Sequence, residues 1–109
     1  MKQYLDESIW ISHLDDPMYL FRCGRKSLIY KLLDENDTII YIGKTNNGGR
    51  RISYHDRHTR NETDIDNAFD FSNVHVIEVS KENQRDIEKY LIQYYKPKYN
   101  KQHIKKKKG

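Results

Sequence analysis

The stretch that decides the fold is residues 27–44, which read SLIYKLLDENDTIIYIGK. Two runs rich in β-branched and aromatic residues, Ser27–Leu33 and Thr38–Ile42, flank four polar turn formers, Asp34 to Asp37. This pattern predicts two antiparallel strands joined by a short turn. Gly43 is expected to end the second strand.

The second half of the chain predicts one more strand and one long helix. Val74–Val79 has strand composition, and Glu82–Tyr94 carries an apolar stripe at helical spacing. The stripe consists of Ile87, Tyr90, Leu91 and Tyr94. Ser80 is a suitable N-cap. The helix should stop near Lys96, because the proline that follows disfavours helical geometry before it.

These elements predict a small α+β domain, with a three-stranded antiparallel sheet flanked by helices. Residues 27–102 are expected to form the domain. Residues 1–26 are expected to form an arm that packs on it as one short strand or turn, and residues 103–109 a disordered basic tail. Between the second and third strands, 50–59 should be helical and 61–73 a loop with a short helix around 65–69.

Length and composition predict one domain with a small core. The chain has 109 residues and a hydrophobic fraction of 36%, which is low for a globular protein. Nine tyrosines compensate in part, because each supplies a large apolar face with a polar tip.

The positive charge is concentrated in two places. Of 20 basic residues, four lie in the tail, which leaves 16 basic against 16 acidic residues in the body. Within the body, residues 44–60 hold five basic residues and a single acid, Asp56. A local basic patch with a basic tail is typical of a protein that binds a polyanion, although a solvated surface gives the same pattern.

Cys23 is the only cysteine, so an intrachain disulfide and a thiolate zinc site are excluded. No apolar run approaches the roughly 20 residues that span a bilayer. The first residues also lack the hydrophobic stretch of a signal peptide. We therefore expect a soluble, cytoplasmic protein with no membrane partner.

The order and spacing of several residues resemble the GIY-YIG nuclease family. Tyr41-Ile42-Gly43 matches the second half of the family name, and Leu28-Ile29-Tyr30 matches the first half except that leucine replaces glycine. Further matches are Lys44, Arg51, His55, Glu88 and Asn100, the last of which closes a segment around Lys96-Pro97 and lies twelve residues after Glu88. The resemblance covers about residues 27–102.

Membership in this family implies metal-dependent cleavage of DNA. The resemblance assigns catalytic roles to Tyr30, Tyr41, Lys44, Arg51, His55 and Asn100, and makes Glu88 the single ligand of Mg²⁺ or Mn²⁺. One tyrosine, assisted by His55 or Lys44, would take the proton of the attacking water. Which tyrosine does so stays open, and Arg50 is the rival of Arg51 for gripping the phosphate.

Further basic side chains are expected to contact the DNA backbone. They are Arg50, Arg57, His58, Arg60, Lys105, Lys106, Lys107 and Lys108. The end of the chain is similar to that of a small phage endonuclease, which suggests a stand-alone enzyme of phage or mobile-element type. A double-strand break would require two visits or a homodimer.

Each candidate also has an ordinary structural interpretation, and two other functions stay open. The tyrosines could be half-buried strand residues, and Glu88 and the histidines solvated surface groups. One alternative is a non-catalytic nucleic-acid-binding module of the same fold, for which Leu28 is the best argument. The other is a small protein that binds a host partner, with residues 1–26 as the binding segment.

Overall fold

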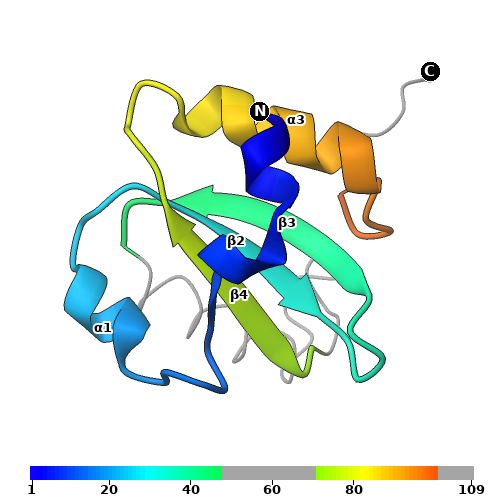
Figure 1. Ribbon diagram of the computed structural model, residues 1–109, viewed down its shortest axis with the longest axis horizontal. Coiled ribbons are helices and arrows are strands. Elements are labelled where there is room, and N and C mark those ends of the chain that lie inside the picture. Colours follow the sequence, from blue (N-terminus) through cyan, green and yellow to red (C-terminus); the bar gives the residue numbers. More distant parts are fainter. Residues whose placement is uncertain (48–70, 101–109) are drawn as a thin grey trace, which may run out of the picture.

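The computed structural model describes residues 1–47 and 71–100. The predicted helices at 50–59 and 65–69 lie outside these ranges. Within them the chain forms a four-stranded sheet with helices and two short 3₁₀ turns (Figure 1). In chain order the elements are η1 (Lys2–Leu5), η2 (Glu7–Ile9), β1 (Ile11–Ser12), α1 (Tyr19–Cys23), β2 (Leu28–Leu33), β3 (Ile39–Thr45), β4 (Asn73–Glu78) and α3 (Gln84–Tyr95).

The predicted hairpin is confirmed as β2 and β3. Its turn is stabilised by the carboxylate of Asp34, which accepts hydrogen bonds from the backbone N–H groups of Asn36 at 2.9 Å and Thr38 at 3.0 Å. A register shift beside Leu32 leaves Ile40 as an extra residue in β3. β3 continues to Thr45, so the prediction that Gly43 ends this strand is wrong.

The sheet has four strands rather than the three predicted from the sequence. The additional strand, β1, pairs antiparallel with β4, with Ile11 opposite Val76 and Ser12 opposite His75. Two residues are too few to produce a periodic pattern, and their pairing depends on a segment more than 60 residues away. The strand order is β1-β4-β2-β3, which places β3 at one edge of the described sheet.

Strand alternation divides the buried residues into two cores, one on each face of the sheet. The tyrosine-side core consists of Cys23, Leu28, Tyr30, Leu32, Ile40, Tyr41, Val74 and Val76. The helix-side core consists of Trp10, Ile29, Ile42, Ile77, Val79, Ile87, Leu91 and Ile92. The helix α3 thus covers one face, while Tyr30 and Tyr41 belong to the other.

The predicted helix is confirmed as α3, with a later start. It begins at Gln84 rather than Glu82, and Asn83, not Ser80, is the N-cap, without a side-chain capping bond. It ends at Tyr95, because Lys96 adopts the left-handed conformation and donates its N–H to the carbonyl of Ile92 at 2.7 Å. Figure 1 shows α3 lying along β3, with η1 beside it.

The first 26 residues make more structure than the single strand or turn expected for them. On the helix-side face, Glu7 reaches the side chain of Lys31 in β2, with Nζ 2.7 Å from Oε2. The ring of Trp10 lies over the same ammonium at 3.9 Å, and its indole N–H donates to the carbonyl of Tyr4. These contacts bury Lys31 completely in the middle of the sheet.

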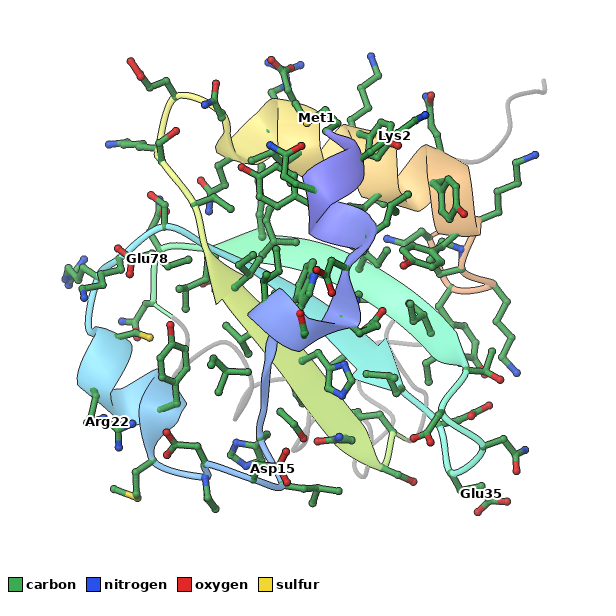
Figure 2. The ribbon with its side chains drawn as sticks, viewed as in Figure 1. Met1, Lys2, Asp15, Arg22, Glu35 and Glu78 are labelled. Atoms are coloured by element: carbon green, nitrogen blue, oxygen red, sulfur yellow. The ribbon has the colours of Figure 1, made fainter. Side chains whose placement is uncertain are left out.

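The two ends of the sheet differ in what they carry. Figure 2 shows Glu35, in the turn of the hairpin, at the opposite end of the sheet from Glu78, the last residue of β4. At the Glu78 end, Leu28 begins β2 and Thr45 ends β3. The chain leaves the described part of the structure just beyond this end, after Asn47. None of the described helices is long and apolar enough to cross a membrane.

Candidate active site

Tyr30 lies directly across Gly43 in the β2–β3 ladder. A Cβ atom at position 43 would lie 2.5 Å from both Cζ and Oη of Tyr30, well inside van der Waals contact. The phenol therefore rests on the bare backbone of Gly43. This contact explains why the second triplet needs glycine at its third position.

The structure brings Tyr41 to the same side of the sheet as Tyr30. Their ring centroids are 6.1 Å apart, with 36° between the ring planes. Regular pairing places them there, because Tyr41 lies two residues before Gly43, the partner of Tyr30, and alternate residues of a strand share a face. Both tyrosines are buried, so the two phenols lie in a packed environment that fixes their positions.

Leu28 occupies the position of the missing glycine without disturbing the strand. Its side chain is fully buried in the tyrosine-side core, and it pairs regularly with Thr45 on one side and Glu78 on the other. The leucine fills core volume one pair away from Tyr30 on the same face. The departure from the family pattern is therefore a packing difference.

A third tyrosine, Tyr19 on α1, packs against the tyrosine-side core. Burial, followed by the neighbouring Cys23, raises the pKa of its phenol above the ordinary value of 10.0. Tyr19 thus stays protonated at neutral pH and is a poor candidate for a general base.

Glu88 lies on the inner side of α3 and is half-buried. It follows Ile87 and precedes Leu91, two residues that pack in the helix-side core. The phenols belong to the other face of the sheet, and α3 packs along β3, the edge strand of the described sheet.

Gln84, one turn before Glu88, connects this side of α3 to the hairpin. Its buried side-chain amide donates to the carbonyls of Leu28 and Thr45, both at 3.0 Å. Sequence reasoning missed this residue. The available signal was a polar residue at a position of the apolar stripe, three before Ile87 and seven before Leu91.

Asn100 is buried and holds β3 from outside the sheet. Its side-chain carbonyl accepts from the N–H of Ile42 at 2.8 Å, and its amide donates to the carbonyl of Ile42 at 2.7 Å. The N–H of Tyr99 also donates to the carbonyl of Ile40. Asn100 therefore binds the backbone at the centre of the Tyr41-Ile42-Gly43 triplet.

The remaining predicted residues are not gathered around the phenols by the described structure. Lys44 is exposed and pairs with Ile29, so strand alternation directs it toward the helix-side face. The others lie outside the described residues, and their roles stay predictions. They are Arg50, Arg51, His55, Arg57, His58, Arg60 and Lys105 to Lys108.

The donor chemistry of the described residues fits a magnesium ion held by a single carboxylate. Within residues 1–47 and 71–100, no three histidine, cysteine, aspartate or glutamate side chains converge on one point. Mg²⁺ commonly keeps several waters and takes only one or two protein carboxylates. Glu88, half-buried on α3, is the carboxylate that the sequence predicts for such a site.

Comparison with known proteins agrees with the geometry. The model of the GIY-YIG catalytic domain matches residues 26–100. Among solved structures, the chain is similar to the GIY-YIG N-terminal endonuclease domain of UvrC from Thermotoga maritima bound to magnesium, with 22% identity and a TM-score of 0.58. That match covers 77% of this chain and 93% of the UvrC domain.

A tyrosine-to-phenylalanine point mutant of the same domain, bound to its catalytic divalent cation, is also similar, with 22% identity and a TM-score of 0.58. This match covers 77% of this chain and 92% of that domain. No curated protein sequence matches the chain. The family model spans more than half of the sequence, and the motif tyrosines Tyr30 and Tyr41 pack in one core. The chain therefore belongs to the GIY-YIG family.

Proposed function

We propose that this protein is a metal-dependent DNA endonuclease that hydrolyses phosphodiester bonds. The observation that carries the proposal is the position of Tyr30, packed on Gly43 and 6.1 Å from Tyr41, in a chain that belongs to the GIY-YIG family. The similar UvrC domain is an endonuclease domain with a bound catalytic cation, which supports the same chemistry here.

The proposed mechanism divides the work among a few side chains. One of the two phenols takes the proton from the attacking water, assisted by His55. Lys44, which strand alternation directs toward the helix-side face, would instead bind phosphate. A phenol has an ordinary pKa near 10, so this step needs cationic groups nearby. Arg51 grips the non-bridging oxygens of the phosphate with paired donors. A Mg²⁺ or Mn²⁺ ion bound at Glu88 supplies Lewis-acid stabilisation of the developing charge.

Burial of the phenols suits this role in one respect. A catalytic group must stay within a fraction of an ångström of its productive position, and a packed ring satisfies that requirement better than an exposed one. Asn100 contributes by fixing the backbone between Tyr41 and Gly43, so its proposed contribution to catalysis is positional.

The substrate contacts are proposed from the sequence. The basic residues of 50–60 and the lysines of 105–108 would bind phosphates without reading the base sequence. One active site per chain cleaves one strand. A double-strand break would therefore require a homodimer or two successive encounters.

A plasmid-nicking assay tests the proposal. The wild type should convert supercoiled plasmid to the nicked form in Mg²⁺ and leave it intact in EDTA. Glu88→Ala should abolish nicking while DNA binding and the thermal midpoint are retained. Asp86→Asn, which removes an exposed acid from the same helix, is the matched control and should cleave normally. Undiminished nicking by Glu88→Ala in Mg²⁺ would refute the metal role.

A further inference from the structure

Gln84 makes two side-chain hydrogen bonds that join α3 to the β2–β3 hairpin. Its amide nitrogen has two hydrogens, and each has an acceptor at 3.0 Å, one on each strand. Gln84 is only 7% exposed, so these bonds form away from competing water. Losing them would leave the buried carbonyl of Leu28 and the part-buried carbonyl of Thr45 without these donors.

The two acceptors belong to a single rung of the hairpin ladder. Leu28 and Thr45 are paired in register, and the next pair on the same face is Tyr30 with Gly43. Gln84 therefore fixes the start of α3 against the Leu28–Thr45 pair, which is the neighbour of the Tyr30–Gly43 pair on the same face. An apolar side chain would pack at this place, but it would not select one rotation of the helix.

The same residue determines where Glu88 lies. Residues four apart on a helix lie on one side, with Cβ atoms about 6 Å apart. If the amide of Gln84 is held by β2 and β3, the carboxylate of Glu88 is held one turn further along the same edge. We propose that Gln84 is a positioning residue that orients Glu88 for the divalent cation. This inference rests on the proposed function of Glu88 as the metal ligand.

Metal binding is the measurement that separates this role from a general contribution to stability. Gln84→Met keeps the length of the side chain and removes both donors. Changing a residue that orients a metal ligand typically lowers the metal affinity at least tenfold. We therefore expect the half-saturating Mg²⁺ concentration for nicking to rise about tenfold. The KM for DNA should stay unchanged. Gln93→Met makes the same substitution at an exposed position of α3 and should behave as the wild type.

Titration with Mn²⁺ followed by electron paramagnetic resonance, without DNA, gives a readout that does not depend on activity. Weaker Mn²⁺ binding in a folded Gln84→Met protein supports the proposal. A lower thermal midpoint with unchanged Mn²⁺ affinity would overturn it and leave Gln84 a purely structural residue. If Gln84→Met does not fold at the assay temperature, Gln84→His, which keeps one donor, decides by the same criterion.

The same titration separates this inference from the proposed function. Wild-type Mn²⁺ affinity in Glu88→Ala would refute Glu88 as the ligand and with it the basis of the proposal. Loss of Mn²⁺ binding in Glu88→Ala together with normal binding in Gln84→Met would refute the role of Gln84 alone.

Discussion

The phenol of Tyr30 lies on the backbone of Gly43, at a place where a Cβ would come within 2.5 Å of the ring. Tyr30 and Gly43 stand in different triplets of the sequence, yet they form one cross-strand pair. The two triplets are therefore parts of a single structural unit. The glycine leaves the space, and the tyrosine fills it.

Gly43→Ala should damage activity more than stability. The added methyl group must push the buried ring of Tyr30 aside, at a cost of about 1–3 kcal/mol in the free energy of unfolding. A displacement of a catalytic group by about 1 Å can lower the rate by roughly a hundredfold. Single-turnover nicking and urea unfolding of the same variant measure the two effects.

Gly24→Ala is the control for this experiment. Gly24 has a φ of 59°, so alanine is strained there, but no atom lies within 4 Å of the added Cβ. It should lower stability and leave the nicking rate of the folded protein unchanged. Normal cleavage by Gly43→Ala would show that the contact with Tyr30 does not matter for catalysis.

Asn100→Ala should loosen β3 at the centre of the Tyr41-Ile42-Gly43 triplet. The substitution leaves the N–H and the carbonyl of Ile42 without their side-chain partners, which costs about 1–3 kcal/mol for a buried group. We expect a lower urea midpoint and slower nicking.

Asn100→Asp tests the same contacts with a different pH dependence. The aspartate keeps an acceptor for the N–H of Ile42 but sets a negative charge against its carbonyl oxygen, which lies 2.7 Å from the amide nitrogen of Asn100. Protonation restores a donor, so this variant should recover stability on acidification relative to Asn100→Ala. A wild-type urea midpoint for both variants would contradict the assignment.

The sequence predicted the parts of the fold that depend on local pattern. The hairpin and α3 show strand and helix periodicity, and the two triplets are recognisable as motifs. The sequence allowed a short strand within residues 1–26 but did not place it in the sheet, because two residues have no period and the partner strand β4 lies far along the chain. The length and cap of α3 were misjudged because the residues after Ser80 form a turn before the helix begins.

The site was predictable only where a motif marks it. Asn100 was named from the motif. Gln84 was not, because it acts through backbone carbonyls of β2 and β3, and a backbone acceptor has no sequence signature. The burial of Lys31 was not predictable from the sequence either. All six residues of β2 are buried, and a charged lysine among them departs from the apolar pattern of a buried strand. Its burial depends on Glu7, which precedes it by 24 residues.

Deleting residues 105–109 should weaken DNA binding and reduce its dependence on salt. Each lysine that neutralises a phosphate contributes roughly 0.9 to the slope of log affinity against log salt concentration, so four lysines account for up to about 3.6. Fluorescence anisotropy with a labelled duplex at several salt concentrations measures the slope. Replacing Lys89 and Lys96 of the α3 region by glutamine is a control at exposed positions outside the tail. An unchanged slope after the deletion would exclude the tail from the interface.

The buried Lys31 predicts a pH dependence of stability on the alkaline side. Burial lowers the pKa of Lys31 below 10.5, and the hydrogen bond and charge of Glu7 oppose that shift without cancelling it. Between the lowered pKa and 10.5 the unfolded chain binds more protons than the folded protein. The free energy of unfolding should therefore rise with pH across this window.

Lys31→Met isolates this effect. Methionine fills the space under the ring of Trp10 without a charge, and Glu7, whose side chain is 52% exposed, stays solvated. The variant should be close to the wild type in stability at neutral pH, and it should lack the rise toward pH 10. Urea midpoints at intervals from pH 8 to pH 10 measure the difference. Above pH 10 the raised pKa values of Tyr95 and Tyr19 act with the opposite sign and end the useful range.

Glu7→Gln should destabilise the protein at neutral pH by removing the partner of the buried Lys31 ammonium. Without the carboxylate, the pKa of Lys31 falls further, so the rise in stability begins at a lower pH and the protein is less stable at neutral pH. Glu7→Gln removes a partner from a buried charge, whereas Lys31→Met removes the charge itself. Glu7→Gln should therefore lower the stability at neutral pH more than Lys31→Met does. Equal losses of stability in both variants at neutral pH would show that packing under Trp10, rather than the buried ammonium, determines the energetics of this face.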